Sequence, residues 1–72
     1  MNEIADAKSI GRIIRTERKK LGYTQTKLAR YAGVSINFVS QLENGKETAE
    51  IGKVICVLHA LGIDLVALKR GE

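Results

Sequence analysis

The sequence predicts an all-α domain of four to five short helices that ends in one β-strand. Three observations support this fold class. Glycines divide the chain into short pieces, and apolar residues within the pieces recur at the three-to-four-residue spacing of an amphipathic helix. Small polar residues suited to helix capping stand near the start of each piece. Only residues 63–68, IDLVAL, replace this spacing with a dense run of β-branched and aliphatic side chains, which is typical of a strand.

Each expected helix has a polar start and a glycine end. The expected N-caps are Ser9, Thr24, Ser35 and Thr48, and the glycines that end the helices are Gly22, Gly33, Gly45 and Gly62. The last helix is apolar around most of its circumference, which predicts that it is covered on more than one side. Its main stripe consists of Ile51, Val54, Ile55, Leu58 and Leu61, flanked by Cys56, Val57 and Ala60. Cys56 is expected to be a small buried hydrophobic residue.

The length of 72 residues allows one domain with short flanks. Residues 1–8 are expected to be an N-terminal extension, residues 9–62 the helical domain, and residues 63–72 a strand and tail. A chain this small is near the lower limit for independent stability, and a lone apolar strand leaves an open edge. A second copy of the chain, paired strand to strand, would bury more apolar area and cover the open edge. The expected dimer interface consists of Val57, Leu61, Ile63, Leu65, Val66 and Leu68.

Basic residues are concentrated in the first half of the chain. Residues 8–30 contain eight basic residues against one acidic residue, a local net charge of +7, whereas the total is +4. Such a segment favours a surface turned toward a polyanion such as nucleic acid, and less so a membrane surface. Charge runs are also the ordinary solvated faces of helices, so charge alone leaves both interpretations open.

The sequence lacks the motifs that are typical of several functional classes. The single cysteine excludes an intrachain disulfide, and neither a CxxC motif nor Cys/His metal spacing is present, so no metal or cofactor is expected. There is no nucleophile–base pair, paired carboxylate or phosphate-binding glycine loop, so an enzyme is not expected. His59 is alone and is expected to pack or to face solvent. No apolar run reaches about 20 residues and the N-terminus does not resemble a signal peptide, which predicts a cytoplasmic protein.

The segment AGVSINFVSQLENGK, residues 32–46, contains a helix with two different faces. Val39 and Leu42 form an apolar docking face. The opposite face is an uncharged polar stripe spaced i, i+3, i+4, i+7, made of Asn37, Ser40, Gln41 and Asn44. Asn and Gln each present a donor and an acceptor together, which matches the major-groove edge of adenine. Ser35 and Ile36 stand at the end where a recognition helix first meets bases. Taken alone, the stripe is more typical of a solvent-facing surface than of a base-reading one.

The residues that precede this helix favour a role in base recognition for its polar stripe. Two helices that cross steeply need a small residue where they approach, here Ala29, and a turn residue that tolerates positive φ, here Gly33. Apolar Val34, Val39 and Leu42 follow. TQTKLARYAGVS, followed by QLENGK, resembles the helix-turn-helix of the phage repressor and Cro family, also called the XRE family. The resemblance covers about residues 10–62 and implies a lambda-repressor-like fold.

The resemblance also implies roles for individual residues. Base-contacting positions are matched by Ser35, Ile36, Asn37 and Gln41, with Ser40 at the flank. Phosphate-contacting positions are matched by Thr24, Gln25, Lys27, Asn44 and Lys46. The position of Gln25 also helps to orient the reading helix in this family. Structural positions are matched by Ala29, Gly33, Val34, Val39 and Leu42, and by an ion pair between Arg18 and Glu43. Phe38 departs from the small or polar residue common at its position, and is expected to join the core.

The C-terminal residues resemble one subgroup of this family. LGIDLVAL stands where most members of this fold have a fifth helix, and it is similar to the end of the HipB-type antitoxins, whose short terminal strands pair between two subunits. The implied function is a homodimeric, sequence-specific repressor of a palindromic operator in double-stranded DNA, acting also on its own gene. The alternative is an antitoxin whose main role is to neutralise a partner toxin, for example a kinase-like protein. RNA binding is disfavoured by the scarcity of aromatic residues.

Overall fold

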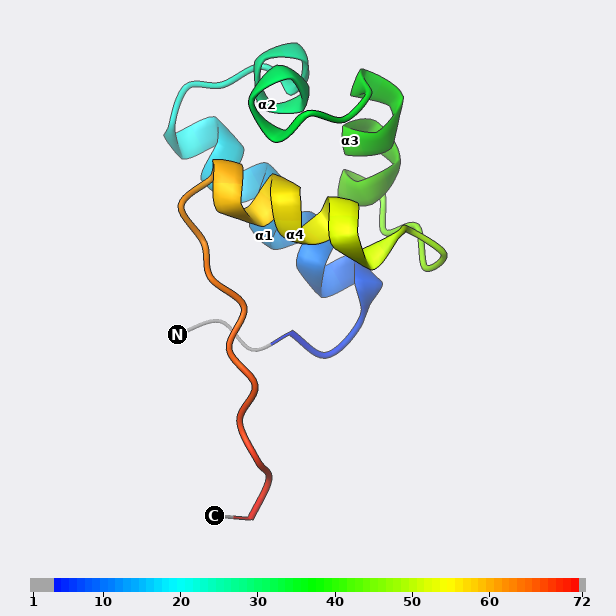
Figure 1. The fold of residues 1–72 in the computed structure, drawn as a ribbon, viewed down its shortest axis with the longest axis vertical. Helices are drawn as coiled ribbons and strands as arrows, with labels where there is room; N and C mark the ends of the chain where they lie inside the picture. The colour runs from blue at the N-terminus through cyan, green and yellow to red at the C-terminus, as the bar shows by residue number, and fades with distance from the viewer. Residues whose placement is uncertain (1–3, 72) are drawn as a thin grey trace.

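The computed structural model describes residues 4–71, in which it forms four α-helices. They are α1 (Ala7–Lys20), α2 (Gln25–Ala32), α3 (Ile36–Glu43) and α4 (Ile51–Ala60). Helix α3 contacts α1 and α2, and α4 contacts α2, so the helices enclose one core (Figure 1). None of the helices in the described part of the chain is long and apolar enough to cross a membrane.

The first helix begins earlier than predicted. Asp6, not Ser9, is the N-cap, and its carboxylate accepts hydrogen bonds of 2.8 Å from both the backbone N–H and the hydroxyl of Ser9. The prediction of Ser9 was wrong because Asp6, three residues upstream, accepts from the Ser9 N–H and starts the helix there, which places Ser9 within the first turn. The side-chain hydrogen bond from Ser9, followed by the backbone one, holds the pKa of Asp6 below its ordinary value.

Two of the other three predicted caps are confirmed. The Thr24 hydroxyl accepts from the backbone N–H of Lys27 at 3.0 Å, and the Ser35 hydroxyl accepts from that of Phe38 at 3.0 Å. Helix α4, in contrast, has Glu50 at its N-cap with no side-chain capping bond, and Thr48 lies in a turn before it. The two helices of the predicted helix-turn-helix therefore both start at a side-chain cap that the sequence identifies.

All four helices end in the same way, at the predicted glycines. In each case a glycine with φ between 72° and 84° follows the last turn, and the next backbone N–H bonds back to the helix. At the end of α2, Gly33 has φ 74° and the Val34 N–H donates to the Ala29 carbonyl oxygen at 3.0 Å. This is the Schellman motif, which requires a left-handed residue that glycine adopts without strain. It fixes the turn between α2 and α3.

The core lies between the helices and is almost entirely aliphatic. Its buried members are Ile14, Leu28, Ala29, Val39, Leu42, Val54, Val57, Leu58 and Leu61, and partly buried Phe38 packs against them as predicted. Val57 and Leu61, expected at a dimer interface, are 0% and 8% exposed within the single chain. They are core residues, because a side chain already buried has little area to offer a partner. Cys56 is exposed, so its predicted burial was wrong.

Gly11 permits the close approach of α1 to the end of α3. A Cβ atom at this position would lie 2.5 Å from the Leu42 carbonyl oxygen and 2.9 Å from that of Glu43. Both atoms are backbone, so neither can rotate away. Gly11 was not predicted as a packing residue, since a glycine inside a helical pattern more often only weakens the helix.

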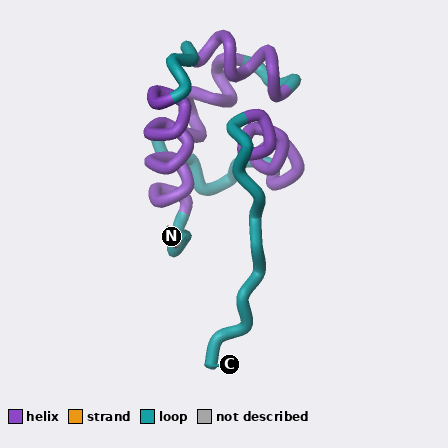
Figure 2. The backbone as a smooth tube through the Cα atoms, turned by 90° about the vertical axis from the view of Figure 1, so that its left-hand side faces the viewer, coloured by secondary structure: helices purple, strands orange, loops and turns teal. Residues whose placement is uncertain are grey.

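Residues 63–70 leave the helical body after α4 as an extended tail (Figures 1 and 2). No strand is formed in the part of the chain that the structure describes, so the fold observed for one chain is all-helical. Three large apolar side chains of the tail are exposed, Leu65 (43%), Val66 (74%) and Leu68 (77%). Ile63 is the exception, because it packs against the core and its N–H bonds to the Leu58 carbonyl oxygen at 2.9 Å.

Candidate nucleic-acid interface

Helix α3 presents its predicted polar stripe on the surface and its apolar face to the core. Val39 and Leu42 are 0% and 3% exposed. We define the reading face as Ser35, Ile36, Asn37, Ser40 and Gln41. The first three of these are exposed, and the last two are partly exposed. Ile36 is 48% exposed at the start of the helix, which leaves an apolar group free to contact a thymine methyl.

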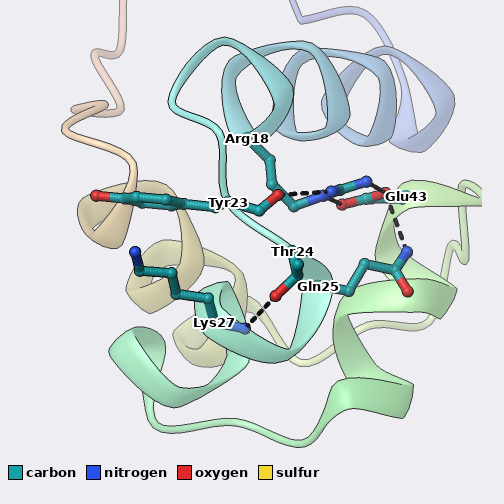
Figure 3. Close-up of polar contacts among 6 residues, drawn as sticks. All are labelled: Arg18, Tyr23, Thr24, Gln25, Lys27 and Glu43. Carbon is teal, nitrogen blue, oxygen red and sulfur yellow. Dashed lines mark hydrogen bonds and ion pairs between the residues drawn. The ribbon is translucent and has the colours of Figure 1, made fainter.

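A buried polar network connects α1, α2 and the end of α3 (Figure 3). Arg18 donates to Glu43 through two nitrogens, with Nε–Oε2 at 2.6 Å and Nη2–Oε1 at 3.0 Å. Its Nη1 donates to the Tyr23 carbonyl oxygen at 2.9 Å. Gln25 Nε2 donates to Glu43 Oε1 at 3.1 Å. The ion pair expected from the resemblance is thus present, as the centre of a network that holds α2 and α3 in one orientation.

Both charged side chains of this network are buried, so each must be neutralised by its partner instead of by water. The side chains of Arg18 and Glu43 are only 11% and 2% exposed. Hydrogen bonding to the Glu43 carboxylate raises the pKa of Arg18 above its ordinary value, against the opposing effect of desolvation. In bidentate pairing of this kind, two N–H groups of the guanidinium donate to the two carboxylate oxygens, so both buried groups form strong hydrogen bonds.

Gln25 takes part in this network, and its bond to Glu43 on α3 fits the orienting role that the resemblance implies for it. A carboxylate only accepts hydrogen bonds, so the Gln25 amide must point its NH₂ group at Glu43. Figure 3 shows this nitrogen directed toward Glu43 and the amide oxygen directed away. Gln25 therefore has one Nε2–H left for a phosphate, and its bond to Glu43 fixes where that donor points.

Lys27, expected to contact phosphate, lies against two aromatic rings. Its Nζ is 5.1 Å from the ring centroid of Tyr23 and 5.8 Å from that of Tyr31, and the two rings meet edge to face at 5.4 Å. A cation at this distance is attracted by the ring faces. The sequence analysis missed this cluster, although the i, i+4 spacing of Lys27 and Tyr31 on one helix was a usable signal.

The end of α3 carries the remaining predicted phosphate contacts. Asn44 is the exposed C-cap residue, and Lys46 is exposed two residues later. Lys46 Nζ donates to the side-chain Oε1 of Gln41 at 3.1 Å. A residue predicted to read bases and one predicted to contact phosphate are therefore joined directly.

Comparisons with known proteins agree with this geometry. A family model described as helix-turn-helix matches residues 14–68. An uncharacterized HTH-type transcriptional regulator, y4mF of Sinorhizobium fredii, is 46% identical over 63 residues, which are 88% of this chain and 83% of that protein. The ImmF control region 10 kDa protein of Bacillus phage phi105 is 30% identical over 67 residues, covering 93% of this chain and 74% of that protein.

Solved structures show the same fold at low sequence identity. A HipB–O4 20mer complex and a HipA–HipB–O2–O3 complex each contain a chain that superposes with a TM-score of 0.88. Both are 18% identical to this chain, and each alignment covers 97% of this chain and 99% of the other. The matched family model, the relatives and the buried helix-turn-helix geometry lead to one conclusion: the chain belongs to the helix-turn-helix family of transcriptional regulators.

Proposed function

We propose that this chain is a sequence-specific repressor that binds double-stranded DNA as a homodimer. The observation that carries the proposal is the reading face: an exposed, uncharged surface on a helix whose opposite face is buried. Uncharged donors and acceptors at fixed positions distinguish base pairs, whereas a charged surface binds all phosphates alike. The names of the phage control-region relative and of the HipB–O4 20mer complex support a regulatory role on DNA.

In this proposal α3 enters the major groove. Ser35, Ile36, Asn37, Ser40 and Gln41 contact base edges. Thr24, Gln25, Lys27, Asn44 and Lys46 lie toward the flanking phosphates. Exposed basic residues on α1, among them Arg12 and Arg15, add salt-dependent affinity for the polyanion. To reach a phosphate, Lys27 either moves away from the two tyrosine rings or donates a hydrogen bond to the phosphate from its position over them.

The tail supplies the dimer contact in this proposal. Residues 9–62 form the DNA-binding domain, and residues 63–68 pair as a strand with the same segment of a second copy. Support comes from the apolar side chains of Leu65, Val66 and Leu68, which are 43%, 74% and 77% exposed in the part of the chain that the structure describes. A two-fold dimer places two α3 helices roughly 34 Å apart, in successive major grooves, and so selects a palindromic operator.

Selection from a pool of randomised duplex DNA tests sequence recognition. We expect the native chain to enrich one palindromic motif. Gln41→Ala is expected to lose preference at one base pair of each half-site, at a cost of about 1–3 kcal/mol, because a single base contact is removed. Thr16→Ala, on an exposed part of α1, is the control and should return the native motif. Equal weakening on every sequence would instead make Gln41 a phosphate contact.

Truncation of the tail tests the dimer. Ending the chain after Asp64 retains Ile63, whose packing and N–H bond belong to the helical body. We expect this variant to keep the helical circular dichroism of the native chain, to sediment as a monomer and to bind operator DNA poorly. The full-length double variant Val66→Asp/Leu68→Asp should behave in the same way, because it charges one face of the strand. A dimer that survives both changes would refute strand pairing.

A second candidate function is that of an antitoxin, and the HipA–HipB–O2–O3 complex favours it. In that case the chain also binds and neutralises a toxin protein, and DNA binding serves to regulate the pair. Co-expression with the open reading frame adjacent to its gene tests this. A stable complex that relieves growth inhibition by the neighbouring product supports the antitoxin function, and unimpaired inhibition without complex formation excludes that product as the target.

A further inference from the structure

Lys46 is joined to Gln41 by two hydrogen bonds. The Lys46 backbone N–H donates to the Gln41 carbonyl oxygen at 3.1 Å, and Lys46 Nζ donates to the Gln41 side-chain Oε1, also at 3.1 Å. Gly45, with φ 84°, turns the chain back along α3 between them. The backbone bond is part of the motif that ends α3, so the fold places the Lys46 backbone beside Gln41, and the side-chain hydrogen bond brings the ammonium group to the Gln41 amide.

This arrangement fixes the chemistry that Gln41 presents. An ammonium group only donates hydrogen bonds, so it requires the amide oxygen on its own side and leaves the NH₂ group pointing away. The second lone pair of Oε1 remains, but the adjacent positive charge makes it a poorer acceptor for a further N–H donor. Together, Gln41 Nε2 and the two unused N–H bonds of Lys46 form an edge made only of donors.

The two purines respond to such an edge in opposite ways. Guanine presents two acceptors in the major groove, N7 and O6, whereas adenine presents the acceptor N7 and the amino donor N6. A glutamine with both amide atoms free matches adenine, which is the base expected from the sequence. A glutamine whose oxygen is occupied by a lysine matches guanine, because an adenine amino group would face the ammonium.

We propose that Lys46 is a positioning residue that directs Gln41 to read guanine rather than adenine, an inference that rests on the proposed sequence-specific DNA binding. Lys46 in this role acts on specificity and does not serve only as a phosphate contact. The four residues after Gln41 close the helix and return Lys46 to its side, so the specificity of α3 is set partly by residues outside the helix.

Parallel selections from randomised duplex DNA test the proposal with the native chain, Gln41→Ala, Lys46→Met and Lys46→Arg. The base pair whose preference disappears in Gln41→Ala is the one that Gln41 reads. At that position we expect the native chain to prefer guanine over adenine by roughly ten-fold. Lys46→Met should shift the preference to adenine, since the amide oxygen is then free. Lys46→Arg should restore guanine, because a guanidinium also only donates.

The outcomes separate this inference from the proposed function. If the native chain enriches no motif, the proposed function itself is wrong. If it enriches a motif with adenine at the Gln41 position, or if Lys46→Met keeps guanine and only weakens all sites equally, the positioning role is overturned while sequence-specific binding stands. Thermal unfolding of the Lys46 variants should match that of the native chain, because the side chain is exposed.

Discussion

Gly11→Ala is expected to destabilise the protein by about 2 kcal/mol, although alanine is the better helix former. The added Cβ would lie 2.5 Å from the Leu42 carbonyl oxygen and 2.9 Å from the Glu43 carbonyl oxygen, so α1 and the end of α3 must separate. Overpacking against atoms that cannot rotate away typically costs about 1–3 kcal/mol. A 2.5 Å approach to a backbone oxygen lies at the upper end of this range, which leaves a net loss of about 2 kcal/mol after the gain of about 1 kcal/mol in helix propensity. In a thermal melt at fixed protein concentration, the midpoint should fall by roughly 10 °C.

Gly52→Ala is the matched control for this prediction. Gly52 also lies within a helix, α4, but a Cβ there meets no atom within 4 Å. This variant should melt at or slightly above the native temperature, because only the propensity term changes. A midpoint for Gly11→Ala equal to that for Gly52→Ala would show that α1 and α3 adjust without cost. Because Gly11 packs on the last turn of α3, its variant should also bind operator DNA more weakly than the control.

The local features of the fold were accessible to sequence reasoning. Thr24 and Ser35 cap α2 and α3, and Gly33 adopts the left-handed conformation that the turn needs. Each depends on chemistry within four residues, which a single sequence contains. The separation of α3 into buried Val39 and Leu42 and an exposed polar stripe follows in the same way from helical periodicity.

Features that depend on contacts between distant segments were not accessible. Gly11 looks like a weak point in a helix until the carbonyl groups of α3 are seen against it. Gln25 was expected at a phosphate and in an orienting role, but its hydrogen-bond partner Glu43, 18 residues away, was not predicted. Val57 and Leu61 were assigned to a dimer because a chain of this size did not seem able to bury them, and four short helices do bury them. The Arg18–Glu43 pair was expected only through the family resemblance, because no local pattern joins residues 25 apart.

The C-terminal tail was predicted to be a strand, and in the described chain it is extended but unpaired with any strand. Its β-branched residues predict a strand, but a strand's backbone groups need hydrogen-bonding partners. Residues 63–70 find none from a neighbouring strand in the chain as described, and they extend away from the helices. The exposed side chains of Leu65, Val66 and Leu68 are consistent with the expected pairing. Sedimentation of the chain that ends after Asp64 and of Val66→Asp/Leu68→Asp tests this pairing.

Removing either member of the Arg18–Glu43 pair is expected to cost about 3–5 kcal/mol, because it leaves the other charge buried without its partner. Glu43→Leu deprives Arg18 of two acceptors, and Arg18→Met leaves the Glu43 carboxylate with only Gln25. Natural domains have roughly 0.05–0.15 kcal/mol of stability per residue, so either change removes much of the total for a chain this small. Urea unfolding of both variants, extrapolated to water, measures the loss. The exposed pair Glu17–Lys20, 3.4 Å apart, is the control, and Lys20→Gln should change stability by less than about 1 kcal/mol.

The double variant Arg18→Met/Glu43→Leu separates stability from DNA recognition. We expect it to recover most of the stability lost by either single variant, since no unpaired charge remains in the protein interior. It should still bind operator DNA more weakly than the native chain, because Gln25 has lost the Glu43 acceptor that fixes its remaining N–H donor. Such a result would show that the network is retained to orient α2 and α3 on DNA and contributes little net stability. A double variant as unstable as Glu43→Leu alone would show instead that the pair itself stabilises the fold, and full native affinity would remove Gln25 from the interface.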